Sequence, residues 1–412
     1  MGRLSRRLRR LREELAFVRG NLLVLILSWT IWAPFSHAVH VYEQVYILAL
    51  GASVAVLGVI AAISSVILGV VRFVGGYVAD RYGRKRILVS MTFIYSSALF
   101  LYALAQDWIW ILVASVITSI CLLYQPALSA ITSDSIPPEK RGVGFALTSL
   151  LPELMGLPGP LLAIYLVSTY GLIMGMRIAY SLMAASGLVA AALRLTLKET
   201  WRPDAGKKED FFHGYREALR FASRDLKAFI AVAVSTNLTA GFFSVIQPFV
   251  IYYLGLSLEE WGFLYMLGGV IWLLVVLPVG FLVDRVGRRK SLISGLTASL
   301  VAFSLLLLAR PLGIVGFWPI LGTMFLLWLG SYMLHNSLSS LEADLVPRPL
   351  RGKLSAVLAL LVDVAGAASS AACGFLYEAI HPTATVGVAM SSLLASLLVA
   401  LAYLREPEHK HE

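Results

Sequence analysis

This chain of 412 residues carries few charged residues. Charged residues make up 14% of it, whereas a soluble globular domain carries about 25%. Hydrophobic residues make up 58%, so too little polar surface is available to cover the apolar mass in water. These proportions exclude a water-soluble globular fold and leave the lipid bilayer as the solvent.

Cysteine and cofactor-binding motifs are scarce as well. The two cysteines, Cys121 and Cys373, fall inside apolar runs, which argues against a disulfide framework and against a metal site. The segment GVGFAL at Gly142 lacks the lysine of a phosphate-binding loop. We therefore expect no metal, no other cofactor, no enzyme activity and no primary pump.

Long apolar runs are what the chain has in abundance. A membrane-spanning helix needs about 20 mostly apolar residues, and a transmembrane β-barrel would alternate polar and apolar positions, which these runs do not. The sequence predicts an all-α membrane protein with twelve transmembrane helices. The predicted spans are Asn21–Leu50, Val54–Val78, Arg86–Ala105, Trp108–Ser133, Gly142–Val167, Gly175–Leu197, Asp225–Leu254, Glu260–Val283, Lys290–Leu308, Phe317–Asp344, Gly352–Ala379 and Ala384–Leu404.

The net charge of +10 could indicate nucleic-acid binding, but its distribution indicates topology instead. Of the 34 Lys and Arg residues, all but Arg72, Arg177 and Arg310 fall on one side of an even-numbered topology, with nine of them between Arg194 and Lys227. The positive-inside rule then places both termini in the cytoplasm of a multi-pass plasma-membrane protein. Anionic headgroups are the expected partner of this basic face, and nucleic acid is not.

The segments outside the spans are expected to lie on the cytoplasmic surface. In residues 1–20, Leu4, Leu8, Leu11 and Leu15 recur among arginines, which predicts an amphipathic surface helix and no cleavable signal peptide. Residues 198–224 form a linker with a second predicted surface helix, and residues 405–412 a cytoplasmic tail.

The chain repeats itself. GGYVADRYGRKR, from Gly75 to Arg86, has a counterpart in GFLVDRVGRRK, from Gly280 to Lys290, at an offset of 204 positions. Past the third span the offset is 210, which pairs Asp134 with Asp344. Residues 21–197 and 225–404 are therefore two copies of a six-helix unit, inserted with the same orientation because six is even.

Both charged turns resemble motif A of the major facilitator superfamily, G-x-x-x-D-R-x-G-R-[RK], and DSIPPEKRG and DLVPRPLRG resemble the loops that follow the family's fourth and tenth helices. The resemblance implies two six-helix bundles that move by alternating access around a central cavity lined by helices one, four, seven and ten. A charge cluster at each turn would lock one conformation. This gate would consist of Gly76, Asp80, Arg81, Gly83, Arg84, Gly280, Asp284, Arg285, Gly287 and Arg288.

Two acids occupy equivalent positions near mid-membrane. Glu153 and Asp363 each follow a span's first glycine by eleven residues, which is about 16 Å of helix in a core of about 30 Å. Ionisable groups at this depth mark function by default, so both are candidates for proton coupling, together with His335. The alternative is a buried acid that only holds the two halves together.

Polar and aromatic stripes in matching register run along the first, fourth, seventh and tenth spans, at helical spacing. They predict a substrate cavity, although small and polar residues also join helices in membranes. Arg72 is expected near the cytoplasmic face, in a snorkelling or structural role. The predicted cavity residues are Trp29, Ser36, His40, Glu43, Gln125, Asn237, Ser244, Gln247, Trp328, Tyr332 and His335.

These features favour a secondary transporter of a small organic solute. Proton-coupled export of amphipathic or aromatic compounds is the first hypothesis, supported by the aromatic stripe and by GLPGP at Gly156, a partial match to motif C of drug–proton antiporters. The alternative is proton-coupled uptake of a sugar or a carboxylate, for which His335 is the only mid-membrane cation in the predicted stripes. A non-transporting receptor is a third hypothesis. Cargo, protons and lipid are the expected partners of a monomer.

Overall fold

The computed structural model describes residues 16–201, 219–222, 224, 226–347, 350–404 and 406, without the side chains of residues 80, 277, 284 and 351. All regular structure in these ranges is helical. The first half contains α2 (Asn21–Ala49), α3 (Val54–Tyr82), α4 (Arg84–Ala103), α5 (Trp108–Cys121), η1 (Leu122–Tyr124), α6 (Gln125–Asp134), η2 (Pro138–Lys140), α7 (Arg141–Gly156), α8 (Gly159–Tyr170) and α9 (Leu172–Arg194).

The second half repeats this order with a more broken first span. It contains α11 (Lys227–Asn237), α12 (Ala240–Phe243), α13 (Ile246–Pro248), η3 (Phe249–Tyr253), α14 (Leu258–Val286), α15 (Arg288–Ala309), α16 (Phe317–Leu345), α17 (Arg351–Ala379) and α18 (Thr383–Ala402). Eleven helical segments are long and apolar enough to cross a membrane, and a bent pair, Lys227–Phe243 with Ile246–Tyr253, makes a twelfth. The all-α, twelve-span prediction is confirmed.

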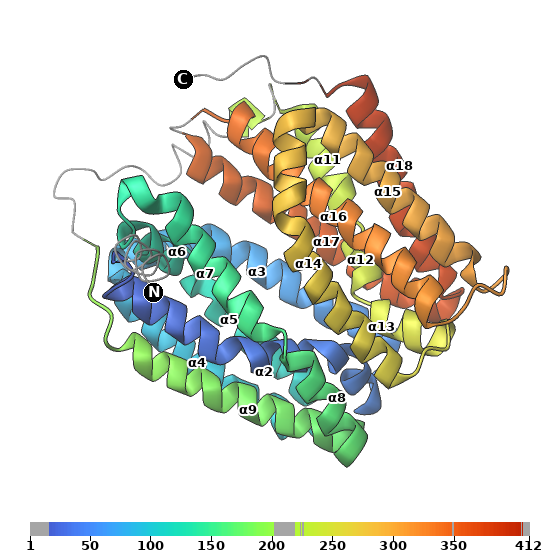
Figure 1. The fold of residues 1–412 in the computed structure, drawn as a ribbon, viewed down its shortest axis with the longest axis horizontal. Coiled ribbons are helices and arrows are strands. Elements are labelled where there is room, and N and C mark those ends of the chain that lie inside the picture. The colour runs from blue at the N-terminus through green and yellow to red at the C-terminus, as the bar shows by residue number, and fades with distance from the viewer. Residues whose placement is uncertain are drawn as a thin grey trace, which may run out of the picture.

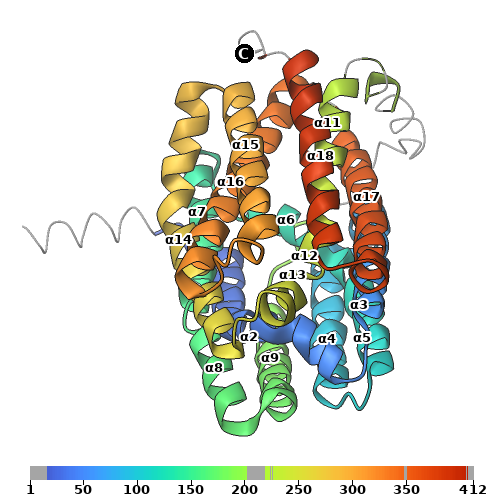
Figure 2. The same ribbon diagram turned by 90° about the vertical axis from the view of Figure 1, so that its right-hand side faces the viewer.

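The helices of each half pack together, as the blue-to-green and yellow-to-red ribbons show (Figures 1 and 2). Helix α2 packs on α7, α8 and α9, and α15 packs on α16 and α18. The halves meet where α3 crosses α17, where α8 touches α14, and where α13 and α14 touch α2. We call the face where α2 begins and α18 ends the terminal face, and the opposite one the far face.

Glycine allows α3 and α17 to approach closely. A Cβ on Gly58 would collide with the Ser370 carbonyl oxygen and lie 2.9 Å from Gly374 Cα, and one on Gly69 would lie 3.2 Å from Asp363 Cβ. Small residues let the backbones of membrane helices pack in this way. This crossing joins the bundles from the far face to mid-depth.

Three predicted spans are broken rather than continuous. The breaks fall around Pro126, Pro158 and Pro248, between α5 and α6, between α7 and α8, and before η3. Proline lacks the N–H that would bond the carbonyl four residues earlier, so each one interrupts the regular helical hydrogen bonding. Discontinuous spans of this kind frequently form binding sites in transporters.

The predicted surface segments lie mostly outside the described residues. The amphipathic helix of residues 1–20 and the linker helix fall largely on residues 1–15 and 202–218. Of the linker helix, residues 219–222 are described and are helical.

Candidate functional site

The two charged turns are built alike at the terminal face. Gly83 and Gly287 adopt φ values of 91° and 102° between successive spans, a backbone region that favours glycine. Arg84 then pairs with Asp134 at 2.8 Å, and Arg288 Nε lies 3.1 Å from the Asp344 carboxylate. The repeat offsets relate these two ion pairs, so each one ties neighbouring spans within its own bundle.

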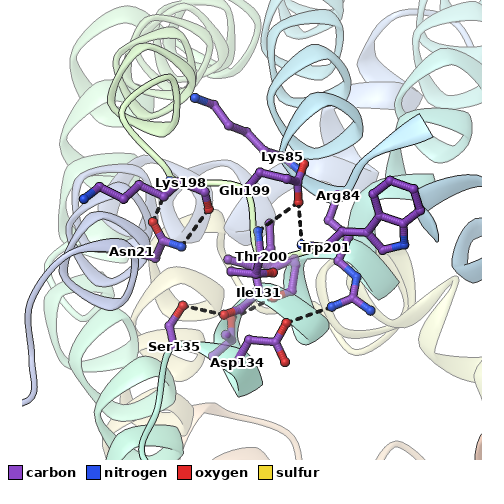
Figure 3. A network of polar contacts seen from close by, with 12 residues as sticks. Asn21, Arg84, Lys85, Ile131, Asp134, Ser135, Lys198, Glu199, Thr200 and Trp201 are labelled. Atoms are coloured by element: carbon purple, nitrogen blue, oxygen red, sulfur yellow. Dashed lines mark hydrogen bonds and ion pairs between the residues drawn. The ribbon is translucent and has the colours of Figure 1, made fainter. Parts of the chain in front are cut away.

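A glutamate caps the helix after each turn, which the sequence reasoning missed. Glu199 accepts a hydrogen bond from the Lys85 backbone N–H at 3.0 Å (Figure 3). Glu406 accepts bonds from the backbone N–H groups of Arg288 and Arg289 at 2.7 and 2.9 Å. Carboxylates are favourable at helix N-termini. The available signal was Leu-Lys-Glu after the sixth span and Leu-Arg-Glu after the twelfth.

The remaining gate residues have different surroundings. The side chains of Asp80 and Asp284 lie outside the described part of the structure. Gly76 and Gly280 have no atom within 4 Å of a Cβ position, whereas a Cβ on Gly75 would lie 2.8 Å from the Leu123 carbonyl oxygen. Arg81 and Arg285 are exposed.

At the far face the bundles are closed by hydrogen bonds. Gln44 Nε2 donates to the Phe243 carbonyl at 2.8 Å, and the Gln44 backbone N–H donates to Gln247 Oε1 at 3.0 Å. In return the Gln247 backbone N–H donates to Gln44 Oε1 at 3.0 Å. The Tyr42 hydroxyl donates to the Leu258 carbonyl at 2.8 Å, and Glu378 accepts from the Val54 N–H. We call the paired amides the glutamine clasp.

A cavity of about 570 Å³, lined by the second bundle and by Arg72 of the first, lies on the other side of this closure. Its walls include Phe229, Glu342 and Ser355, which lie near the terminal-face ends of α11, α16 and α17, so the cavity extends towards the terminal face. Apolar and polar groups share the lining. The lining includes Arg72, Phe229, Asn237, Phe243, Leu334, His335, Leu338, Glu342, Leu358 and Asp363.

An ion pair joins the two bundles at the cavity wall. Arg72 Nη1 of α3 lies 3.1 Å from Asp363 Oδ2 of α17, and Arg72 Nε donates to Gln125 Oε1 of α6 at 3.2 Å. The Asp363 side chain is 16% exposed and that of Arg72 37%. The structural pairing expected of Arg72 is present. Its guanidinium pairs at the depth of Asp363, and Arg72 also lines the cavity.

The equivalent acid has a different partner. Glu153 Oε2 lies 3.5 Å from Nε2 of His37 within its own bundle, and its side chain is 44% exposed. The position equivalent to Arg72 in the second half is Val276, so α14 offers Glu153 no cation there. Glu153 lies near Tyr265 of α14 but does not line the cavity described above. The repeat is thus chemically asymmetric at its two acids.

The predicted stripe residues divide into three groups. Asn237 and His335 line the cavity, and Gln125 reaches it through Arg72. Gln247 belongs to the glutamine clasp, and the His40 ring bonds Glu43 at 3.0 Å beside it. The others pack inside a bundle and do not line that cavity. In the first bundle, Trp29 stacks on the Arg194 guanidinium and Ser36 is 3% exposed. In the second, the Ser244 hydroxyl donates to the Gly241 carbonyl, the Trp328 ring lies over Gly268, and the Tyr332 ring stands edge-on to Trp272.

Arg194, at the terminal-face end of α9, is buried. It was counted among the cations of the cytoplasmic face, but it is 3% exposed inside the first bundle. Its Nε donates to the Ser28 hydroxyl at 3.1 Å and its Nη1 to the Thr92 hydroxyl at 2.8 Å. A basic residue at the end of a span has the same sequence pattern whether its side chain is exposed or buried, so the sequence did not predict this burial.

The sequence profile of the Major Facilitator Superfamily matches residues 20–370 and 228–412. The chain belongs to this superfamily. It is therefore a multi-pass membrane transporter and not an enzyme, which is the coarse function expected from the motifs. The drug-efflux branch is a finer assignment that this match does not reach.

Solved superfamily structures share the fold across almost the whole chain. A bacterial homologue of the human lysosomal transporter Spinster, in an inward-facing and unoccupied conformation, has a TM-score of 0.69 at 18% identity, covering 93% of this chain and 94% of its own. The nucleoside transporter NupG has a TM-score of 0.74 at 15% identity, covering 93% and 98%. Identities this low show the fold alone.

A curated relative is the Na(+), Li(+), K(+)/H(+) antiporter of Planococcus maritimus. It is 31% identical over 176 residues, which are 41% of each chain. The match thus spans about two fifths of that transporter's length.

Proposed function

We propose that this superfamily member is a proton-coupled exporter of amphipathic organic cations, with Asp363 as the carboxylate that binds a proton and a cation alternately. The supporting observation is the Arg72–Asp363 ion pair, which spans both bundles at the wall of the cavity. In the described conformation Arg72 supplies the cation. Cargo would replace Arg72 at the ionised carboxylate, protonation of Asp363 would release cargo on the other side of the membrane, and that proton would leave as the Arg72–Asp363 pair re-forms.

The cavity suits such cargo in charge and in shape. Asp363 and Glu342 place two carboxylates against the one guanidinium of Arg72, which leaves an excess of negative charge when His335 is neutral. Phe229, Phe243, Leu334, Leu338 and Leu358 supply apolar wall. An apolar pocket with few polar groups is typical of small-molecule sites, and a carboxylate in low dielectric attracts a cation strongly.

Exchange of alkali-metal cations for protons is the second candidate, favoured by the antiporter of Planococcus maritimus to which part of this chain is similar. It would use the same carboxylate. Among the described residues no group of three or more His, Cys, Asp or Glu could hold a metal ion, so an inorganic cation would depend on Asp363 together with hydroxyl, amide or carbonyl oxygens. The apolar walls favour the organic cargo.

The alternative function, carboxylate uptake, requires a cation at the cavity. Arg72 lines the cavity, although the sequence did not predict it there. Asp363 neutralises that cation, however, and Glu342 adds repulsion. A plasma-membrane location with cytoplasmic termini remains part of the proposal. It makes the terminal face cytoplasmic and the described conformation open towards the cytoplasm.

Flux into proteoliposomes tests the proposal. With an acidic lumen, we expect accumulation of ethidium, an aromatic cation, to rise up to about tenfold per pH unit for electroneutral one-to-one exchange. Radioactive sodium, glucose and lactate serve as comparison cargoes. Sodium accumulation without ethidium transport would support the second candidate, and uptake of glucose or lactate into an alkaline lumen would contradict cation–proton exchange.

A further inference from the structure

The first bundle buries a cation that has no acidic partner. Arg194 ends α9 with 3% exposure, and it forms no ion pair with any described carboxylate. Its described side-chain contacts are hydroxyls and rings: Ser28, Thr92, and the faces of Trp29 and Tyr124 at 5.2 and 5.8 Å from Cζ. All of these groups are formally neutral.

These contacts supply hydrogen bonds but no formal negative charge. Hydroxyls and aromatic faces orient towards a guanidinium and stabilise it. The C-terminal end of α9 contributes the equivalent of about half a negative charge. A buried ion needs an opposite charge or a full set of hydrogen bonds to offset the loss of water. A counter-ion from solution would complete the compensation.

A small, partly open space is lined by Arg194. A cavity of about 20 Å³ is lined by Arg194, Trp29, Thr92 and Ser96, among others. It exceeds the roughly 10–15 Å³ that one water-sized particle requires. A polyatomic cargo would not fit in it, and a halide ion, which is larger than a water molecule, would fit only singly.

One polar group in this wall has no partner. The Ser96 side chain is 1% exposed, and its Oγ forms no hydrogen bond. An unsatisfied buried hydroxyl costs about 1–3 kcal/mol, so it favours a ligand that accepts a hydrogen bond. The rings of Trp32 and Tyr95, whose planes meet at 66°, also line the cavity.

We propose that this cavity binds a monovalent halide, with chloride as the physiological ion, between the Arg194 guanidinium and the Ser96 hydroxyl. The ion neutralises the bundle interior and ties α9, α4 and α2 together. The site is separate from the transport cavity, since Arg72 and Asp363 do not line it. Its existence does not depend on the cargo.

Two measurements on the full-length purified protein test the halide site. Crystals grown or soaked in sodium bromide should show an anomalous peak beside Arg194. The thermal unfolding temperature should rise saturably as chloride replaces gluconate at constant sodium, because a ligand of the folded state stabilises it. Ser96→Ala should raise the chloride concentration at half-effect about tenfold or more, as expected when an ion loses a hydrogen bond.

Ser299→Ala is the matched control, because the Ser299 hydroxyl is also 1% exposed and unpartnered but lies in the second bundle. It should leave the chloride response unchanged. The chloride response of Ser96→Ala tests the proposal even if Arg194→Gln fails to fold. No bromide peak, an unfolding temperature indifferent to chloride, or an identical response in Ser96→Ala and the parent would overturn the proposal, and the cavity would then hold water alone.

Discussion

Asp363→Asn is expected to abolish the pH dependence of transport and to reduce gradient-driven ethidium accumulation to the background of empty liposomes. The amide cannot exchange a proton, and it leaves Arg72 without its counter-charge. Removing one partner of a fully buried ion pair costs about 3–5 kcal/mol, and the 37% exposure of Arg72 lowers that cost here. The variant should therefore fold, and its defect should lie in coupling.

Glu153→Gln is the matched control, since the repeat makes Glu153 equivalent to Asp363 and the structure pairs it with His37 away from the transport cavity. We expect it to retain pH-driven accumulation within about threefold of the parent, the change that about 0.6 kcal/mol produces. Equal losses in both variants would mean that the two acids act as a pair. Unchanged pH-driven transport in Asp363→Asn would remove Asp363 from the mechanism.

Arg72→Gln separates the roles of the two partners. A nearby cation favours the ionised form of a carboxyl group, so its removal should move the midpoint of the pH–transport profile to higher pH while leaving transport proton-coupled. Arg72 thus acts as a positioning residue. A profile identical to the parent's would show that Arg72 only holds the bundles together.

Gly58→Ala is expected to shift the conformational equilibrium towards a state open at the far face. Its methyl group would meet the Ser370 carbonyl and the Gly374 backbone, neither of which can move aside as a flexible side chain can. Overpacking of this kind costs about 1–3 kcal/mol, which is about a 5- to 150-fold change in the equilibrium. The strain exists only while α3 and α17 touch near the far face, so the closed state bears it.

Spin-label distances between the bundles measure this shift. Labels at Gln106 and Leu312, on the far-face connections after α4 and α15, should move apart in Gly58→Ala. Labels at Glu139 and Lys290, at the terminal face, should approach each other. Gly387→Ala is the control, because no atom lies within 4 Å of its Cβ position. Distances equal to the parent's in Gly58→Ala would contradict the far-face closure.

The spans could be predicted from sequence because hydropathy is a local property. Breaks inside a span are harder to predict from the sequence. Proline is tolerated within α2 at Pro34 and within α14 at Pro278, yet Pro158 interrupts its span. Local sequence does not distinguish these cases, because neighbouring helices decide whether a freed carbonyl finds another partner.

The candidate site was predicted in part. Asp363 stood out through its depth and its repeat equivalence, and Asn237 and His335 through helical spacing. The partner of Asp363 did not, because Arg72 lies 291 positions away in the other half. A pair that crosses the pseudo-two-fold axis has no sequence spacing of its own. The repeat even argued against it, since the position equivalent to Arg72 is a valine.

Proton release on cargo binding tests the central claim most directly. The purified transporter in weakly buffered solution, at a pH where Asp363 carries its proton, is mixed with ethidium while the pH is recorded. The account predicts about one proton released per ethidium bound by the parent and by Glu153→Gln, and none by Asp363→Asn. Stoichiometric binding to the parent without proton release, or the same release from Asp363→Asn, would contradict exchange at this carboxylate.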